Sequence, residues 1–284
     1  MLFTSWLSER LGLSFRTPGL AARLASKRRA RPAQRAFRPS LECLEERWVP
    51  STLTVTNNLD SGAGSLRADI AAAHNGDTIV FAPSLDGQTI TLTSGELLIR
   101  KNLTIAGPGA GELTVSGNNA SRVFEVTKTP NSVTLSGLTI SNGVANGVGQ
   151  LSGGGGILNH GTLTVSGGTL SGNSAAQGGG IFNDGTLTVS NSTLTGNSAS
   201  YGGGINNQGT LTVSGSTLSG NVATSAGGGI YNYATGTATV KNSSSITGNT
   251  APAGFGADVY NQGLLYLDAS NIIGILDGNH PVPI

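Results

Sequence analysis

GGGILNHGTLTVSGGTLSGNSAAQ at 154–177 is followed without a gap by GGGIFNDGTLTVSNSTLTGNSASY at 178–201 and by GGGINNQGTLTVSGSTLSGNVATSA at 202–226. The three segments are copies of one repeating unit. Each unit carries an isoleucine and, two positions later, an asparagine, and both recur in the next unit: Ile157, Ile181, Ile205 and Ile230, and Asn159, Asn183, Asn207 and Asn232. A fixed period of this kind predicts a solenoid, in which each unit packs against its neighbours.

Within each unit, apolar and polar residues alternate as they do in a β-strand. In GTLTVS, Leu187 and Val189 fall on one side of the strand, and Thr186 and Thr188 fall on the other. One side is therefore expected to be buried. The GGG and GN groups supply positive-φ corners, which β-branched residues disfavour. We expect three short strands and three corners per coil, with isoleucines stacked in the core and asparagines hydrogen-bonded from coil to coil.

The repeat predicts an all-β fold, namely a single right-handed parallel β-helix over residues 51–284 with about 24 residues per coil. The regular GGGIxN repeats span 153–263. A leucine-rich repeat has a similar period, but these units lack the LxxLxLxxN spacing and have no helical half. A Gly/Ser-rich linker would not keep apolar residues in register.

Both ends of the predicted β-helix carry features that protect an open coil. Segment 64–81 contains SLRADIAAAH at 65–74, a helix-forming stretch with Leu66, Ile70 and Ala73 on one face. We predict a short N-terminal capping helix here, followed by the first strand of the regular stack, because solenoids need capped ends. At the other end, the final HPVPI places two prolines where the last strand edge is exposed.

Residues 1–50 differ in charge from the rest of the chain. They hold ten of the 16 Lys and Arg residues and four of the 15 acidic residues, whereas 51–284 hold six and eleven. We predict that 1–50 is a basic export or targeting segment, disordered or removed. A nucleic-acid-binding arm is the alternative, but the basic stretch lacks interleaved aromatic residues. Cys43 is the single cysteine, and no apolar run is long enough to cross a membrane, so no intramolecular disulfide and no transmembrane segment are expected.

Three segments resemble parts of bacterial surface proteins. The units over 153–263 resemble the polymorphic outer membrane protein repeat, most closely in GGGIFN at 178–183. GSLRADIAAAHNGDTIVF (64–81) resembles the CSLREA motif, and RPSLECLEERWVPS (38–51) is similar to the segment that closes the basic N-terminal region of many planctomycete surface proteins. These resemblances imply an exported, extracellular or cell-surface β-helix protein associated with the outer membrane, and they imply no reaction.

Parallel β-helices also host polysaccharide lyases and glycoside hydrolases, which need carboxylates gathered on one outer face. After Lys128 the only basic residue is Lys241, and Asp184 is the only acid within the three most regular units. His160 takes the place of Asp184 one coil earlier, about 5 Å away at the spacing of neighbouring strands. His160 and Asp184 are therefore the weak candidates for an acid–base pair, with a solvated corner as the alternative interpretation.

Metal and cofactor sites are not predicted. The stretch from Gly254 to Asp258 resembles a calcium-binding nonapeptide, G-x-G-x-D, but such sites need an adjacent repeat that this chain lacks. We interpret it as a degenerate GGGIxN unit.

The residue after each core isoleucine or valine forms a column that strand alternation directs outward: Leu158, Phe182, Asn206, Tyr231 and Tyr260. Aromatic rings on a flat face suit sugar rings, so Phe182, Tyr231 and Tyr260 are predicted ligand-binding residues for a cell-surface or extracellular polysaccharide. Packing along the solenoid is the alternative explanation. The sequence thus favours a structural or adhesive surface protein over a polysaccharide lyase or glycoside hydrolase.

Overall fold

The computed structural model describes residues 49–128, 132–145 and 152–284. Chain contacts divide the protein after Glu46, and all described residues belong to the second unit, Arg47–Ile284. The predicted export segment 1–50 therefore lies almost wholly outside the described residues, as does most of the planctomycete-like segment 38–51.

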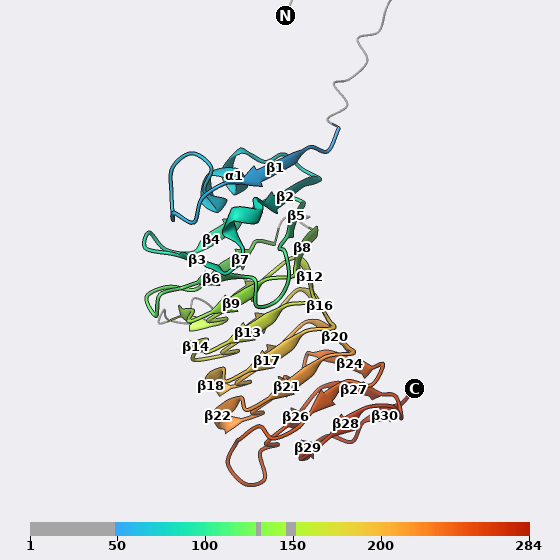
Figure 1. Ribbon diagram of the computed structural model, residues 1–284. Coiled ribbons are helices and arrows are strands. Elements are labelled where there is room, and N and C mark those ends of the chain that lie inside the picture. Colours follow the sequence, from blue (N-terminus) through green and yellow to red (C-terminus); the bar gives the residue numbers. More distant parts are fainter. Residues whose placement is uncertain (1–48, 129–131, 146–151) are drawn as a thin grey trace, which may run out of the picture. The chain divides into compact units, whose positions relative to one another are not determined.

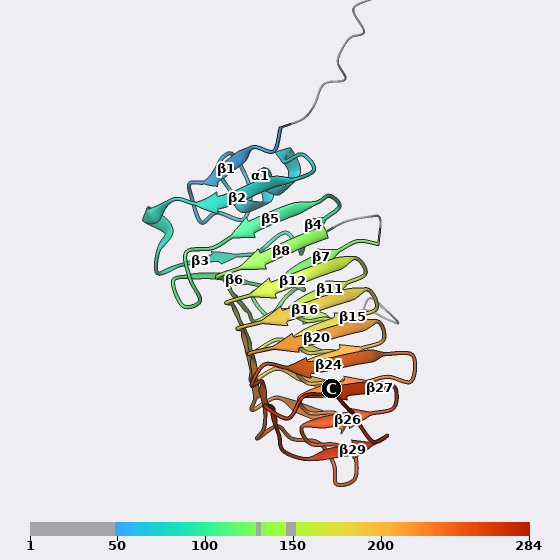
Figure 2. The same ribbon diagram turned by 90° about the vertical axis from the view of Figure 1, so that its right-hand side faces the viewer.

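The second unit is a parallel β-helix of about eight turns with about 26 residues per turn, as the repeat predicts. Successive coils stack from β1 to β30, and every strand pairing among the described residues is parallel (Figure 1). Each regular coil contributes one strand in turn to four sheets, which we call sheets I, II, III and IV in chain order. Figure 2 shows sheet I face on, with its strands following one another in chain order.

The described strands fall into the four sheets as follows. Sheet I contains β1(Thr52–Val55), β2(Asp77–Phe81), β5(Leu103–Ala106), β8(Ser132–Ser136), β12(Thr162–Ser166), β16(Thr186–Ser190), β20(Thr210–Ser214), β24(Thr237–Lys241), β27(Leu264–Leu267) and β30(Val282–Pro283). Sheet II contains β3(Gln88–Thr91), β6(Leu113–Ser116), β9(Thr139–Ser141), β13(Thr169–Ser171), β17(Thr193–Thr195), β21(Thr217–Ser219), β25(Ser245–Ile246) and β28(Ile272–Ile273). Sheet III contains β10(Val144–Ala145), β14(Ser174–Ala175), β18(Ser198–Tyr201) and β22(Val222–Ala226). Sheet IV contains β4(Leu97–Ile99), β7(Phe124–Val126), β11(Ile157–Asn159), β15(Ile181–Asn183), β19(Ile205–Asn207), β23(Ile230–Asn232), β26(Val259–Asn261) and β29(Leu276–Gly278).

The predicted period of about 24 residues holds from Thr164 to Thr188, and the preceding coil, from Thr134 to Thr164, is longer. One detail of the predicted coil is wrong. The regular coils have four strands rather than three, because the residues between the GN corner and the GGG group form sheet III. This strand is short and buries only small side chains such as Ala199 and Ala223, so it has no apolar signal in the sequence.

Isoleucine over isoleucine forms one wall of the core. Ile157, Ile181, Ile205 and Ile230 are paired in register across sheet IV and are all 0% exposed. The glycine triplets lie directly before these strands. A Cβ on Gly179 would lie 2.4 Å from the Ser198 carbonyl oxygen and 2.6 Å from that of Gly203. Backbones of neighbouring coils therefore approach too closely here for any side chain.

Two ladders of buried asparagines run along the corners of the coils. In the first, each amide nitrogen donates to the amide oxygen of the next coil at 2.7–2.8 Å, through Asn159, Asn183, Asn207, Asn232 and Asn261. In the second, the same bond measures 2.8–2.9 Å through Asn173, Asn197, Asn221 and Asn249. A buried amide leaves no donor or acceptor unpaired in such a stack, which explains why asparagine recurs at both corners.

The predicted capping helix is present as α1(Leu66–Ala72), and a short 3₁₀ helix, η1(Pro83–Leu85), follows β2. Ser65 is the N-cap of α1, and its hydroxyl accepts a hydrogen bond from the Ala68 amide at 3.2 Å. Leu66, Ile70 and Ala73 are buried against the first coils, as their spacing predicts. Figure 1 shows α1 at the same end of the stack as β1.

Asp60 ties the loop before α1 to the second coil. Its carboxylate accepts hydrogen bonds from Arg67 Nη2 at 2.7 Å, from the Ser94 amide at 2.9 Å and from the Ser94 hydroxyl. Burial alone would raise the pKa of Asp60, but the hydrogen bonds from Ser94 and Arg67 and the positive charge of Arg67 lower it to about 2.

The lowered pKa of Asp60 predicts that the cap loosens in acid. A carboxyl group whose pKa falls on folding stabilises the protein above its unfolded pKa, near 4, and loses that effect as the pH falls toward 2. The melting temperature of the wild type should therefore decrease more steeply between about pH 4 and pH 2 than that of Asp60→Asn. Thermal unfolding followed by circular dichroism at a series of pH values measures both slopes. The exposed Asp86→Asn serves as the control and should keep the wild-type slope; equal slopes for all three proteins would contradict the prediction.

Candidate functional site

The outer side of sheet IV carries the residues that strand alternation predicts there. The position after the first, inward-facing apolar residue of each of these strands is paired in register along the stack: Glu125, Leu158, Phe182, Asn206, Tyr231, Tyr260 and Asp277. We call this set the outer row. The register of the predicted aromatic column is therefore present in the structure.

The outer row is not exposed along its whole length. Leu158 is 1% exposed, Phe182 2% and Tyr231 7%. The chain that leads into each GGG group folds over the row, and a Cβ on Gly153 would lie only 2.9 Å from Phe182 Cγ. The expectation of an exposed column is therefore wrong for Phe182, whose ring packs beneath the backbone and does not reach a surface.

Farther along the outer row lie two adjoining pockets, of about 490 and about 310 Å³. Both are lined by Tyr201 and Tyr231. The other residues that line the first pocket are Pro252, Phe255, Tyr260, Gln262 and the end of β22, and those that line the second are Gln177, Asn206, Gln208 and Tyr233. We call the two pockets together the tyrosine groove. It contains four of the five tyrosines of the chain.

The rings of the groove contact one another in a continuous cluster. Tyr231 and Tyr260 are stacked, with centroids 5.8 Å apart and planes 9° apart. Tyr201 and Tyr233 tilt against Tyr231 at 5.3 and 6.1 Å, and Phe255 tilts against Tyr260 at 5.8 Å. Tyr201 and Tyr233 are each 41% exposed, and Phe255 is 46% exposed. The cluster thus has a packed floor and open aromatic edges.

The Tyr231 hydroxyl donates to Gln262 Oε1 at 2.9 Å. Burial raises the pKa of Tyr231, and the neighbouring tyrosines Tyr233, Tyr201 and Tyr260 raise it further. The phenol is therefore neutral at any physiological pH and acts as a hydrogen-bonding group at the floor of the groove.

Asn206 lies in the outer row between the rings of Phe182 and Tyr231. It is 1% exposed, and its Oδ1 accepts no hydrogen bond from the described residues. The two neighbouring glutamines pair with each other instead, since Gln208 Nε2 donates to Gln177 Oε1 at 3.3 Å. Asn206 lines the second pocket, and its Oδ1, which is covered in this structure, is a buried hydrogen-bond acceptor that has no donor.

Sequence reasoning found Tyr231 and Tyr260 but missed Tyr201, Tyr233 and Phe255. Tyr201 precedes the glycine triplet at 202–204, and Phe255 stands in the matching place before Gly256. The residues in that place form the rim of the groove, because the chain there crosses over the outer row. An aromatic residue directly before the glycine corner of a unit, as at Tyr201 and Phe255, is the sequence feature that could have indicated this rim.

His160 and Asp184 lie in contact, with Nδ1 and Oδ1 2.7 Å apart. Their side chains are 18% and 26% exposed. The two residues follow the ladder asparagines of adjacent coils, so the stacking of identical coils places them side by side. The next coil has Gln208, which lines the second pocket, in the same position of the repeat.

One group of ionisable residues was missed entirely. Arg122 is 5% exposed, and its Nη1 donates to Glu96 Oε2 at 2.5 Å and contacts Glu125 Oε2 at 3.3 Å. Its remaining nitrogens donate to the carbonyl oxygens of Gly153 and Gly154. Burial raises the pKa of Glu125, a hydrogen bond and the charge of Glu96 raise it further, and Arg122 and His160 oppose the shift. Two carboxyl groups are thus gathered on one buried guanidinium.

The calcium-like stretch from Gly254 has a different structural role. Asp258 is 3% exposed, its Oδ1 accepts hydrogen bonds from the backbone amide and side-chain nitrogen of Asn249, and its Oδ2 accepts one from the Ile275 amide. Asp258 therefore terminates the second asparagine ladder. Among the described residues no three His, Cys, Asp or Glu side chains gather as a metal site would require.

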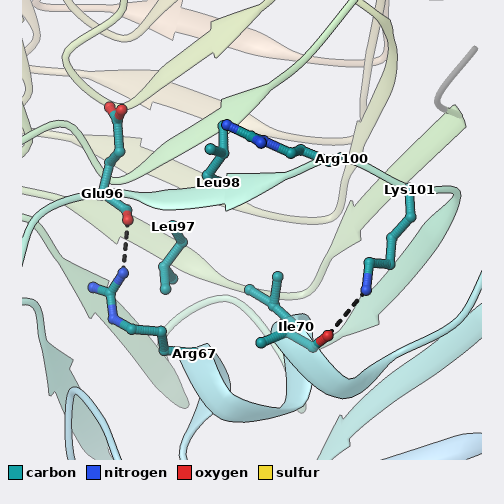
Figure 3. A pocket seen from close by; sticks show the side chains of 8 residues that line it. Arg67, Ile70, Glu96, Leu97, Leu98, Arg100 and Lys101 are labelled. Carbon is teal, nitrogen blue, oxygen red and sulfur yellow. Dashed lines mark hydrogen bonds between the residues drawn. The ribbon is translucent and has the colours of Figure 1, made fainter. Parts of the chain in front are cut away.

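A further pocket of about 330 Å³ lies between α1 and β4 (Figure 3). Figure 3 shows Arg67 turned toward the Glu96 backbone and Lys101 reaching the helix. Arg67 Nη1 donates to the Glu96 carbonyl oxygen at 2.7 Å, and Lys101 Nζ donates to that of Ala71 at 3.1 Å. Both cations are thus used to hold the cap on the first coils.

Comparisons with protein-family models, with curated proteins and with solved structures found no match to this chain. The fold is that of a β-helix repeat protein. In the part of the chain that the structure describes, no helix has the length and apolar character that crossing a membrane requires.

Proposed function

We propose that this protein is an exported structural or adhesive β-helix of the cell surface, and that it binds polysaccharide in the tyrosine groove. One observation carries the binding part: four of five tyrosines, which the sequence scatters between Tyr201 and Tyr260, meet in one open groove. A chain with so few aromatic residues gains nothing for its core from Tyr201, Tyr233 and Phe255, which remain 41–46% exposed. Exposed aromatic clusters of this kind mark binding sites.

Sugar rings suit this groove for a physical reason. Their apolar C–H faces stack on aromatic rings, while their hydroxyl groups pair with amides and phenols at the edges. The groove offers both, since the rings of Tyr201 and Phe255 lie beside Gln262 and the Tyr231 hydroxyl. A solenoid also presents an extended face, along which a polymer gains affinity from many weak contacts.

The export part rests on the resemblances of 38–51, 64–81 and 153–263 to segments of bacterial surface proteins, including the polymorphic outer membrane protein repeat. A surface role also fits the low content of charged residues, 11% of the chain. A reporter fused behind residues 1–50 tests this part in a planctomycete host. Retention of the reporter in the cytoplasm would remove the surface assignment and leave the groove unaffected.

The binding prediction concerns the two exposed tyrosines. Tyr201→Ser combined with Tyr233→Ser should weaken retention by polysaccharide in affinity electrophoresis by between about fivefold and about 150-fold, because each stacked ring is worth about 0.5–1.5 kcal/mol. Tyr266→Ser is the matched control. Tyr266 lies in β27 of sheet I and is the one tyrosine outside the groove. Equal loss in the control, or unchanged retention in the double variant, would reject the groove as the binding site.

A second function, polysaccharide cleavage, is favoured by the carboxyl pair of Glu96 and Glu125. A carboxyl group of raised pKa beside a second carboxyl is the arrangement from which a general acid and its base arise. If this group is catalytic, the full chain releases reducing ends from a polysaccharide, and Glu125→Gln reduces that rate at least a hundredfold. Asp184→Asn then reports whether the His160 pair takes part. Absence of any release by the wild type from acidic and neutral polymers would dismiss this second function.

A further inference from the structure

We propose that the ligand of the tyrosine groove is an electrically neutral polysaccharide, and that Asn206 Oδ1 accepts a hydrogen bond from one of its hydroxyl groups. This inference rests on the proposed function and adds to it the chemical class of the ligand. Two features lie together and point to this ligand. The aromatic groove has no charged lining residue, and Asn206, which lines it, has a buried amide oxygen that accepts no hydrogen bond.

The walls of the groove carry no charge. None of the side chains that line either pocket is Asp, Glu, Lys, Arg or His. Acidic polysaccharides are bound through Arg and Lys, which pair with carboxylate or sulfate groups. Lys241 is the only Lys or Arg in residues 129–284, and it belongs to β24 of sheet I rather than to the groove. A polyanion would find no counterion here.

The charges nearest to the groove along its face have the wrong sign for a polyanion. Asp277 is paired in register with Tyr260 at one end. At the other end, Asp184 stands one coil before Gln208 in the same place of the repeat. Asp277 repels a negatively charged polymer laid along the stack, and Asp184, which is paired with His160, offers it no counterion. A neutral polymer is unaffected by either group.

Asn206 supplies the polar specificity. A folded protein rarely buries an amide oxygen without a donor, since the lost hydration is not replaced. Neighbouring coils place Phe182 and Tyr231 at this position, so packing alone would be served by an apolar residue. Asn206 lines the second pocket beside the exposed ring of Tyr233. Oδ1 is covered in the free protein, so binding requires the Asn206 amide to turn toward the pocket, where each hydroxyl of a stacked sugar ring can serve as its donor.

The charge preference is tested with pairs of polymers that share a backbone and differ in charge. Suitable pairs are hydroxyethylcellulose and carboxymethylcellulose, methyl-esterified and de-esterified galacturonan, and dextran and dextran sulfate. In affinity electrophoresis of the full chain, the neutral member of at least one pair should retain the protein at least tenfold more strongly than its charged partner. Equal or stronger retention by the charged members would overturn the inference while the proposed function stands. No retention by any of the six polymers would overturn both.

The role of Asn206 is tested by Asn206→Leu, with Asn206→Ala as a smaller replacement that cannot overfill the site. Retention by the neutral polymer should fall about tenfold in both variants, while the melting temperature of Asn206→Leu rises above that of the wild type. A purely structural asparagine would give the reverse pattern. A lower melting temperature for both variants, or unchanged retention in either folded variant, would overturn the assignment.

Discussion

Ile205→Asp is expected to cost the β-helix at least about 3 kcal/mol of unfolding free energy and to leave much of the protein unfolded. Ile205 is 0% exposed and stands between Ile181 and Ile230 in the stacked column. A carboxylate at this position has no partner on either side, and an unpaired buried charge is among the few changes that destabilise so strongly. Urea unfolding followed by circular dichroism measures the loss.

Thr210→Lys is the matched control for this substitution. Thr210 begins the next strand of the same coil and faces solvent, so lysine there should change the unfolding free energy by no more than about 0.5 kcal/mol. Similar losses at the two positions would show that the inward and outward sides of these strands are assigned wrongly.

Asn207→Leu is expected to destabilise the protein strongly although the two side chains have the same number of heavy atoms. Asn207 Nδ2 donates to Asn232 Oδ1 at 2.8 Å, and its Oδ1 accepts from Asn183 Nδ2 at 2.7 Å. Leucine would leave Asn232 Oδ1 buried without its donor and would remove the bonds from Asn207 Nδ2 to the carbonyl oxygens of Gly209 and Thr237. Asn183 Nδ2 keeps the carbonyl oxygens of Gly185 and Thr210 as acceptors. A buried group left unpaired costs about 1–3 kcal/mol of unfolding free energy, and the loss is read from urea unfolding in the same way.

The adjacent residue provides the control. Asn206→Leu introduces the same side chain one position earlier and removes an oxygen that has no partner, so the variant should be more stable than the wild type. Two neighbouring asparagines thus respond to one substitution with opposite signs. A loss of stability at both positions would show that the ladder bonds do not distinguish them.

The stacking of coils could be predicted from the sequence because a constant period leaves each side chain opposite its own copy. Ile181 meets Ile205, and Asn183 meets Asn207, whatever the shape of the corners between them. Contact between His160 and Asp184 follows from the same rule. The rule fails where the period changes. Glu96 and Glu125 meet across an irregular coil, and no fixed spacing in the sequence indicates that Arg122 joins them.

The groove could be predicted only in part, because strand alternation gives the direction of a side chain but not what covers it. Phe182 and Tyr231 point the same way from positions of the outer row on either side of Asn206. A close crossing of the chain at Gly153 buries Phe182, whereas Tyr201 and Phe255 leave a hollow over Tyr231. That difference depends on the path of the segments before the glycine triplets, and those segments have no periodic pattern.

The identity of the coils at 154–225 has a consequence for how the length of this protein changes in evolution. Removing residues 178–201 would bring Ile157 against Ile205 and Asn159 against Asn207, a seam with the same contacts as the two it replaces. Near-identical tandem units of this kind are also prone to unequal recombination in the gene that encodes them. Each unit gained or lost shifts the cap relative to the far end by about 4.8 Å, the spacing of neighbouring strands. A solenoid of this kind is a spacer whose reach can change in whole coils, and removal of 178–201 would in addition take Tyr201 out of the tyrosine groove.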